Sequence, residues 1–460
     1  MAEGGRTPSS PNPRELGSGP YDGAGAPRRA SSPRGPGGRP KSRRRPQADN
    51  GGGWTGRRFE VTVGAVAHGG HCVARHEGRV VFVRHTLPGE RVVVEVTEDR
   101  HAGFCRADAV EVLEAAPDRV ERPCPYSGPG RCGGCDWQHV GHAGQLGLKA
   151  AVVREQLSRL AGLDVPVVVE ALPGGPLRWR SRARFAVERT GEPGLRRHRS
   201  HDVVPLEDCP ITVEPAARAV LARRWLDAAA VDVAVDSAGV VTTTTLDRRG
   251  GPQETQVLRP GADVPEEPAG RASRSAGGRD WEVEGTGFWQ VHPAAADALV
   301  GAVSAFAAVR AGETVLDLYA GAGLFGGALA PGIGAGGRVV CVESDAAACA
   351  AADANLADLP QAEVWQGDVD APGLTELLDD LGRPDVVVLD PPRAGAGRAV
   401  SQVIAAAGPR AVVYVACDPA ALARDVAAFT AAGFRLEALR AFDCFPMTAH
   451  VECVALLVRA

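Results

Sequence analysis

The stretch LDLYAGAGLFG, residues 316–326, joins an apolar strand pattern to a glycine-rich turn that leads into a helix. Gly321 and Gly323 let the backbone approach a ligand closely at this turn. Further on, VVCVESD (residues 339–345) ends a second apolar run at Glu343. In doubly wound sheets a carboxylate at this place accepts hydrogen bonds from both hydroxyls of a ribose. The two stretches predict a nucleoside site at the carboxyl ends of neighbouring parallel strands.

The same alternation of strand and helix continues to the C-terminus. Val-rich runs are separated by helical patterns of about 10–15 residues, as in parallel sheets covered by helices. The runs RLEALRAFDCF (435–445) and HVECVALLVRA (450–460) close the pattern. We therefore predict an α/β fold for residues 286–460, with a doubly wound, mainly parallel sheet of the Rossmann-like kind.

One feature, Asp317, favours S-adenosylmethionine over a dinucleotide as the ligand. The turn GAGLFG formally fits the dinucleotide pattern G-x-G-x-x-G. However, Asp317 precedes it, and a carboxylate there repels a pyrophosphate but suits the amino group of S-adenosylmethionine. In VVVLDPPRAGAG (386–397), Asp390 and two prolines predict a rigid platform for a planar polar acceptor. That motif does not specify which atom is methylated.

Cys417 ends an apolar strand in VVYVACDPAAL, residues 412–422. Taken alone, such a cysteine is more often a core residue than a nucleophile. As a nucleophile, it would begin a turn into a helix whose N-terminus, with nearby cations, is expected to lower the pKa of the thiol.

A cluster of cysteines lies in PCPYSGPGRCGGCDWQH, residues 123–139. Cys124, Cys132 and Cys135 have the spacing C-x7-C-x2-C, and Cys209 follows far downstream. Four thiolates of this kind fit a structural zinc or a [4Fe-4S] cluster, and spacing alone does not separate the two.

Length indicates several domains, and the charge distribution places contact with a nucleic acid at the basic front of the chain; a solvated tail with no fixed partner is the alternative. A chain of 460 residues exceeds one ordinary core. Residues 1–58 carry a net charge of +8 and residues 312–460 a net charge of −10. Residues 1–55, rich in Gly, Pro, Ser and Arg, are expected to be a disordered basic tail. Without a run of about 20 apolar residues or a signal-peptide pattern, we expect a cytoplasmic monomer with no membrane contact.

The regions between the tail and the α/β domain predict RNA contact. Residues 56–115 show short β-type runs of an OB-like barrel, and GRVVFVRHTLPGERV (78–92) resembles the RNA-binding TRAM domain. Residues 116–285 are expected to form a central RNA-binding region that carries the cysteine cluster. In it, RWRSRARF (178–185) is expected to place four arginines on one face of a strand: Arg178, Arg180, Arg182 and Arg184. The row would follow a phosphate backbone, and a solvated charged face is the alternative.

The order of these motifs resembles one family. The barrel, the cysteine cluster, FWQVHP, DLYAGAG, DPPRAG, VACDP and HVECVALL follow the order of the RNA uracil-5 methyltransferases, in their TRAM-bearing, iron–sulfur branch. The resemblance implies that Cys417 is the nucleophile, that Glu452 is the base and that the four clustered cysteines hold a [4Fe-4S] cluster. It also implies that residues 286–460 form a class I, S-adenosylmethionine-dependent methyltransferase domain, whose cofactor and base pocket contains Gln290, Tyr319, Gly321, Glu343, Asp368 and Asp390.

The resemblance implies transfer of a methyl group from S-adenosylmethionine to carbon 5 of an RNA uridine, through a covalent adduct between Cys417 and carbon 6. The expected substrate is 23S rRNA, and a uridine of the tRNA T-loop is the alternative. Two other functions remain open at this point: an amino-group methyltransferase that uses DPPR alone, and a non-catalytic RNA-binding protein.

Overall fold

The structure, a computed structural model, describes residues 53–101, 103–261, 271–285 and 287–460. The predicted disordered tail (residues 1–55) lies almost wholly outside this range. Residues Trp54–Ala460 form one compact unit. Within the described ranges, no helix is long and apolar enough to cross a membrane. The domain boundaries predicted from the sequence stay predictions, although the sheets follow the expected order along the chain.

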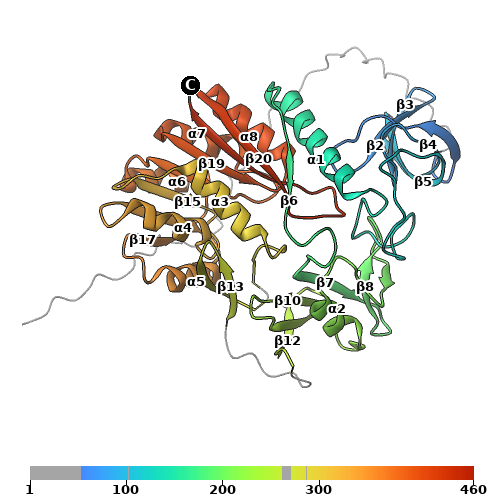
Figure 1. The fold of residues 1–460 in the computed structure, drawn as a ribbon, viewed down its shortest axis with the longest axis horizontal. Helices are drawn as coiled ribbons and strands as arrows, with labels where there is room; N and C mark the ends of the chain where they lie inside the picture. Colours follow the sequence, from blue (N-terminus) through green and yellow to red (C-terminus); the bar gives the residue numbers. More distant parts are fainter. Residues whose placement is uncertain (1–52, 102, 262–270, 286) are drawn as a thin grey trace, which may run out of the picture. The chain divides into compact units, whose positions relative to one another are not determined.

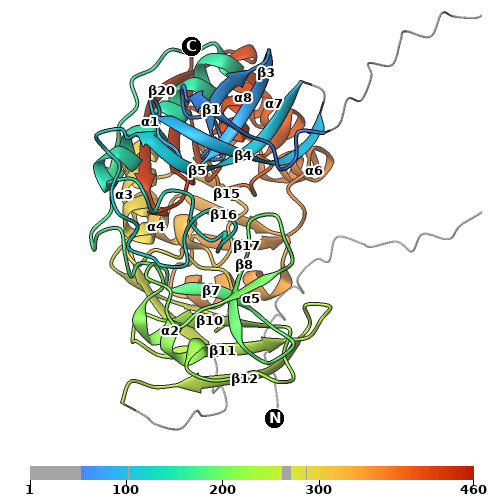
Figure 2. The same cartoon turned by 90° about the vertical axis from the view of Figure 1, so that its right-hand side faces the viewer.

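The first five strands form a small barrel (Figures 1 and 2). They pair in the order β1-β4-β5-β3-β2. Beyond β1 the chain turns to pair with β2, where Gly64 N donates to Val73 O at 2.7 Å, so the two edges of the sheet are joined. Valines alternate inward along β3 and β4 and fill the interior. The strands are β1 (Arg58–Thr62), β2 (Cys72–His76), β3 (Arg79–Arg84), β4 (Arg91–His101) and β5 (Phe104–Glu114).

The second sheet follows the cysteine segment and a long helix, α1 (His142–Gln156), which ends in a π-helical turn (Leu157–Ala161). Six strands pair in the order β12-β11-β10-β7-β8-β9, and α2 (Glu214–Leu221) packs against β10 and β11. The strands are β7 (Arg182–Val187), β8 (Pro193–Arg196), β9 (Val203–Pro205), β10 (Ala230–Val235), β11 (Val241–Leu246) and β12 (Pro252–Leu258).

The predicted row of four arginines on one strand is wrong. Strand β7 begins at Arg182, so only Arg182 and Arg184 lie within it. Arg178 has a φ of 55°, which breaks the extended geometry that a period of two requires. The segment before β7 instead runs beside residues 210–212, where Arg178 N donates to Pro210 O at 2.8 Å. Trp179 and Phe185 are buried, as their apolar character predicts.

The third sheet is the predicted doubly wound one, with eight strands in the order β17-β16-β15-β18-β19-β21-β20-β6. The strands from β17 to β19 pair in parallel, and β21 is antiparallel to both β19 and β20. The strands are β6 (Val169–Ala171), β15 (Thr314–Leu318), β16 (Arg338–Glu343), β17 (Ala362–Gln366), β18 (Val386–Leu389), β19 (Ala411–Ala416), β20 (Phe434–Asp443) and β21 (Glu452–Arg459).

Helices cover both faces of this sheet (Figure 1). On one face α3, α4 and α5 pack against it together with the hairpin of β13 (Ala272–Ala276) and β14 (Arg279–Val283); on the other, α1, α6, α7 and α8 do so. The strands between them are buried on both sides, which explains their continuous Val-rich runs. The helices are α3 (Ala295–Ala307), α4 (Leu324–Ile333), α5 (Ala346–Leu356), α6 (Ala371–Leu381), α7 (Gly397–Ala407) and α8 (Pro419–Ala431).

Candidate active site

A cavity of about 1120 Å³ opens at the carboxyl ends of β15, β16, β18 and β19, where doubly wound sheets bind ligands. Its walls come from the turns after these strands, from residues 287–291 and from the start of β21. Every residue predicted from the sequence for the cofactor pocket and for catalysis lines it: Gln290, Tyr319, Gly321, Glu343, Asp368, Asp390, Cys417 and Glu452.

The glycine-rich turn is held in a conformation that suits a ligand. Tyr319 has a φ of 60°, and its hydroxyl donates to Val369 O at 3.2 Å. Gly323 has a φ of 85° and immediately precedes α4. A Cβ at Gly323 would lie 3.0 Å from the Leu356 side chain, so a larger residue is excluded by both conformation and space.

Glu343 is fixed at the end of β16 by backbone amides. Its Oε2 accepts from Gly321 N at 3.0 Å, while Oε1 accepts from Ser344 N at 2.7 Å and Asp345 N at 2.9 Å. The carboxylate thus joins the two strand ends and lies on the cavity wall, where it is oriented for ribose hydroxyls.

Asp317 does not take the place expected from the sequence. It is buried beneath the turn and is absent from the cavity wall, so it is not placed to meet an amino group. Its Oδ2 accepts from Gly326 N at 2.7 Å, at the start of α4, and Oδ1 has no hydrogen-bond partner in the part of the chain that the structure describes. Burial raises the pKa of Asp317 to about 7. The side chain therefore supports the turn from below.

A thiol and two carboxyl groups meet at the other end of the cavity. Cys417 follows β19, Asp390 follows β18, and Glu452 begins β21, beside β19. Burial, and after it the charges of Glu452 and Asp390, raises the pKa of Cys417 to about 12. Burial raises the pKa of Asp390 to about 7, and burial followed by the charge of Asp390 holds the pKa of Glu452 well above its usual range.

The predicted lowering of the Cys417 pKa is wrong for this cavity. The N-terminus of α8 does follow the cysteine, but Asp418 caps it by accepting from Ala421 N at 2.8 Å. Arg393 is the cation that lowers the pKa of Cys417, and it is outweighed by burial and by the two carboxyl groups. Activation of the thiol therefore requires removal of its proton when substrate is bound.

Sequence reasoning overlooked Phe288, which is 73% exposed and lies on the cavity wall. An aromatic ring exposed at a cavity is well placed to stack on a planar base. The sequence signal for Phe288 was its place in the FWQVHP motif, two residues before Gln290.

The four predicted metal-binding cysteines come together in the structure. Burial, and to a smaller extent the neighbouring thiols of Cys209 and Cys124, raises the pKa of Cys132 to about 11. The same causes raise the pKa of Cys135, where the thiols of Cys209, Cys132 and Cys124 all contribute. Nevertheless, among the described residues no three His, Cys, Asp or Glu side chains are grouped so as to hold a single metal ion.

The predicted RNA-binding arginines have different partners. Arg178 forms an ion pair with Asp208 at 2.6 Å, and Arg184 forms one with Asp232 at 2.6 Å. Arg180 donates to Arg182 O at 3.2 Å, and the guanidinium of Arg182 lies 6.0 Å from the Phe288 ring centre. Arg182 therefore lies near a residue of the cavity wall, Phe288.

Comparison with known proteins agrees with this arrangement. Residues 55–110 match the TRAM domain, and residues 374–460 match the family described as tRNA (uracil-5-)-methyltransferase. An RNA methyltransferase of Streptomyces coelicolor, itself uncharacterized, is 46% identical over 87% of this chain and 93% of its own length. A 23S rRNA (uracil(1939)-C(5))-methyltransferase of Pseudomonas entomophila is 33% identical over 87% of this chain and 94% of its own. The chain belongs to the RNA uracil-5 methyltransferase family.

This family membership makes the protein an S-adenosylmethionine-dependent RNA (uracil-C5)-methyltransferase, and confirms the enzyme class predicted from the sequence. Its fold resembles that of a solved tRNA (uracil-54, C5)-methyltransferase of Pyrococcus abyssi in complex with S-adenosyl-L-homocysteine. That likeness has a TM-score of 0.63 and 22% identity, over 86% of this chain and 99% of the other. It confirms the class I methyltransferase fold.

Proposed function

We propose that this RNA uracil-5 methyltransferase acts through a covalent adduct between Cys417 and carbon 6 of the target uracil, with Glu452 as the base. The observation that carries the proposal is the convergence of Cys417, Asp390 and Glu452 on one cavity with the nucleoside-binding turn. Carbon 5 of uracil is a poor nucleophile, so it must be activated before methylation.

The cavity fits S-adenosylmethionine. Its volume of about 1120 Å³ has room for a nucleoside cofactor beside a base. Glu343 would hold the ribose, and the backbone at Gly321 would meet the methionine part. Gln290 and Asp368 would complete the cofactor wall. When bound there, the cofactor supplies an electrophilic methyl group on a positively charged sulfur.

Each step on the uracil has a residue to perform it. The Cys417 thiolate adds to carbon 6, and the electron pair moves through carbon 5 toward the carbonyl oxygen, giving an enolate-like ring. Asp390 and Arg393 would bind the uracil edge and stabilise that charge. After carbon 5 has gained its methyl group, Glu452 removes the proton from carbon 5, and the thiolate leaves. Because burial holds the pKa of Glu452 above its usual range, its carboxylate is a stronger base than an exposed one.

We also propose that Cys124, Cys132, Cys135 and Cys209 hold a [4Fe-4S] cluster. In such a cluster each thiolate binds a different iron, so the sulfurs lie farther apart than around one zinc. Burial, together with the neighbouring thiols of Cys209, Cys132 and Cys124, raises the pKa of Cys135, which supports one shared site for the four thiols. Iron and zinc content of protein purified without oxygen tests this choice, because zinc alone would contradict it.

The cysteine segment contacts the loop that leads to the proposed base. The backbone amides of Asp136 and Trp137 both donate to Met447 O at 3.0 Å, and Asp136 Oδ2 accepts from Ala449 N at 3.1 Å. A cluster at Cys135 would therefore stabilise residues 444–451, and through them Glu452. This contact supports a structural role for the cluster.

For the substrate we propose a uridine of 23S rRNA, since two 23S rRNA (uracil(1939)-C(5))-methyltransferases of Pseudomonas are 33–34% identical over 87% of this chain. The T-loop uridine of tRNA is the second candidate, on the match to the tRNA (uracil-5-) family. Mapping 5-methyluridine in both RNAs from a deletion strain decides between them. We expect one rRNA uridine to lose its methyl group while tRNA keeps its own; the reverse result would contradict the proposal.

RNA that contains 5-fluorouridine at the target tests the covalent step. Fluorine at carbon 5 does not leave as a proton would, so the adduct at Cys417 should persist on a denaturing gel. An amino-group methyltransferase or a non-catalytic RNA-binding protein would give no such adduct, and its absence would contradict the proposal.

A further inference from the structure

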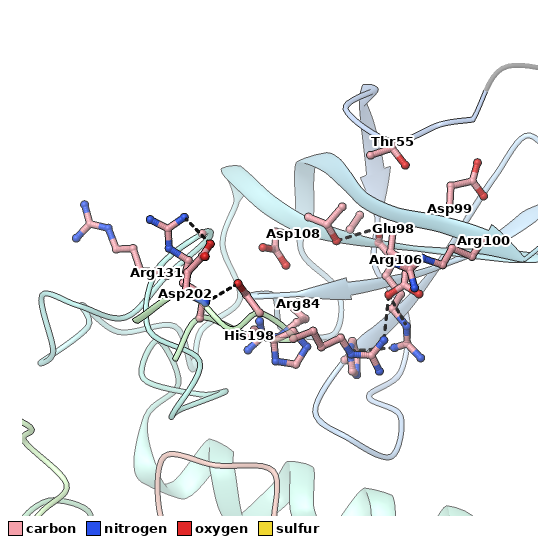
Figure 3. A pocket seen from close by; sticks show the side chains of 18 residues that line it. Thr55, Arg84, Glu98, Asp99, Arg100, Arg106, Asp108, Arg131, His198 and Asp202 are labelled. Atoms are coloured by element: carbon pink, nitrogen blue, oxygen red, sulfur yellow. Dashed lines mark hydrogen bonds and ion pairs between the residues drawn. The ribbon is translucent and has the colours of Figure 1, made fainter. Parts of the chain in front are cut away.

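A second cavity, of about 500 Å³, shares no lining residue with the candidate active site. Strands β4 and β5 of the barrel form one wall, and the loops at residues 128–131 and 197–202 form the other (Figure 3). The first loop lies within the cysteine segment, and the second joins β8 to β9. The barrel and the central region thus build this cavity jointly.

The cavity has more cations than its carboxylates neutralise. Glu98 pairs with Arg199 at 3.0 Å and with Arg106 at 3.9 Å. By contrast, Arg100 and Arg131 form no ion pair with a carboxylate of the described part of the chain. Arg131 donates to the backbone oxygen of Pro125. Guanidinium groups without a carboxylate partner beside a cavity are suited to the phosphates of a nucleic acid.

Two imidazole rings, those of His71 and His198, line the same cavity. The Arg106 guanidinium lies over Phe82 and Phe104, 5.6 and 5.8 Å from the ring centres, and its Nη1 lies 3.3 Å from His71 Nε2. Since arginine only donates, His71 Nε2 accepts. Burial lowers the pKa of His71 and of His198 to about 4, so both imidazoles are neutral at physiological pH. Neutral rings and a fixed guanidinium plane are surfaces on which RNA bases stack.

Asp108 distinguishes this cavity from a simple phosphate site. Figure 3 draws its carboxylate in the open space between the barrel and the two loops. The side chain of Asp108 forms no hydrogen bond or ion pair with any residue in the described ranges. Burial raises the pKa of this carboxyl group. A carboxylate repels phosphate but accepts hydrogen bonds from a base edge. Guanine alone among the RNA bases presents two adjacent N–H donors, N1–H and the 2-amino group, on its Watson–Crick edge.

We propose that this cavity binds one unpaired guanosine of the RNA substrate. Asp108 accepts from N1–H and the 2-amino group of the base, a neutral histidine ring stacks on it, and Arg100 and Arg131 bind the flanking phosphates. The inference rests on the proposed RNA substrate. It adds a second point of recognition, separate from the target uridine.

Fluorescence anisotropy of the full-length protein with short uridine-rich RNAs tests this inference. The RNAs carry one central guanosine, inosine or adenosine and are compared at one fixed salt concentration. A bidentate contact predicts that guanosine binds about tenfold more tightly than adenosine. Inosine, which lacks the 2-amino group, should fall between them. Equal affinity for the three RNAs would overturn the proposal.

Two variants separate base recognition from phosphate binding. Asp108→Asn replaces one acceptor by a donor and so matches the N6–H and N1 of adenine; we expect the preference to reverse toward the adenosine RNA. Arg131→Gln should weaken all three RNAs alike and reduce the salt slope by about one. A guanosine preference that persists in Asp108→Asn would contradict the proposal.

Two controls complete the test. GMP alone should compete weakly; affinity equal to that of the guanosine RNA would assign the cavity to a free nucleotide and contradict our proposal. Trapping on 5-fluorouridine RNA reports on Cys417 alone. If 5-fluorouridine RNA is trapped but binding shows no preference for guanosine, only this inference is overturned. If binding prefers guanosine but no RNA is trapped, only the proposed mechanism is overturned.

Discussion

At the scale of the residue, Cys417 lies among groups that oppose its ionisation. Burial is the largest of these effects, followed by Glu452 and Asp390, while Arg393 acts in the opposite direction. In the proposed mechanism, such a thiol would react only once its proton has been removed and the uracil is bound.

The raised pKa predicts a specific pH dependence of adduct formation. With a Cys417 pKa of about 12, the thiolate fraction grows about tenfold per pH unit through the neutral range. The rate of trapping on 5-fluorouridine RNA should therefore rise steadily from pH 6.5 to 9. Quenched time courses at each pH measure it, and a rate that is constant above pH 7 would contradict the account.

Arg393 offers a second test at this scale. Because Arg393 lowers the pKa of Cys417, Arg393→Gln should slow trapping at every pH, by roughly tenfold for each unit by which the pKa rises. Arg398→Gln, an exposed arginine of α7 away from the cavity, is the matched control and should trap at the wild-type rate. Equal rates for the two variants would exclude this role of Arg393.

At the scale of the element, the barrel contacts the start of α8. His68 Nε2 lies 3.0 Å from Asp418 Oδ2, and Asp418 is both the N-cap of α8 and the neighbour of Cys417. The hydrogen bond that His68 donates to Asp418 raises the pKa of His68; Glu155 of α1 acts in the same direction, and burial and Arg424 of α8 act against it. The contact links the barrel loop to the turn that carries the nucleophile.

His68→Gln measures this contact through its pH dependence. The folded pKa of His68 lies above 6.5, so the ion pair stabilises the fold fully below pH 6.5 and is lost as pH rises through the raised pKa. The pair is partly exposed, so the effect should stay below about 1 kcal/mol. In thermal unfolding, the Tm of the variant should lie below that of the wild type at pH 6. At pH 8.5 the two Tm values should be equal.

Asp418→Asn is the companion variant, since it keeps an N-cap acceptor but removes the charge. It should reproduce the pH dependence of His68→Gln. A Tm difference that is the same at both pH values would mean that His68 acts through packing alone.

At the scale of the whole molecule, one buried ion pair joins distant parts of the chain. Lys149 of α1 donates to Asp443 at the end of β20 and to Phe445 O at 3.1 Å, and the Lys149 and Asp443 side chains are fully buried. His142 Nε2 adds a contact to Asp443 at 3.0 Å. Burial lowers the pKa of Lys149, while Asp443 opposes that shift. The pair fixes α1 against the loop that leads to Glu452.

Removing one partner of this pair should destabilise the protein strongly. Lys149→Ala leaves Asp443 buried without its cation, which costs about 3–5 kcal/mol in comparable cases. Lys149→Met with Asp443→Leu, which removes both charges, should recover most of that loss. Urea unfolding monitored by tryptophan fluorescence compares the variants, and a double variant as unstable as Lys149→Ala would contradict the explanation.

The sequence predicted those parts whose signals are local. Apolar periodicity revealed the strands of the doubly wound sheet, and turn glycines with a following carboxylate revealed the pocket at Gly321 and Glu343. The buried position of Asp317 and the raised pKa of Cys417 depend on neighbours distant in the chain, so no local pattern encodes them. The arginine row failed because Arg178 adopts a left-handed conformation. Period-two spacing predicts a shared face only where the backbone is extended.

The most direct measurement of the central claim uses Glu452→Gln with substrate RNA and S-adenosylmethionine. Without its base, the enzyme should methylate carbon 5 but fail to eliminate, so protein and RNA should stay joined on a denaturing gel. Cys417→Ala should give no joined species and no 5-methyluridine. Full turnover in Cys417→Ala, or release of methylated RNA by Glu452→Gln at the wild-type rate, would contradict the account.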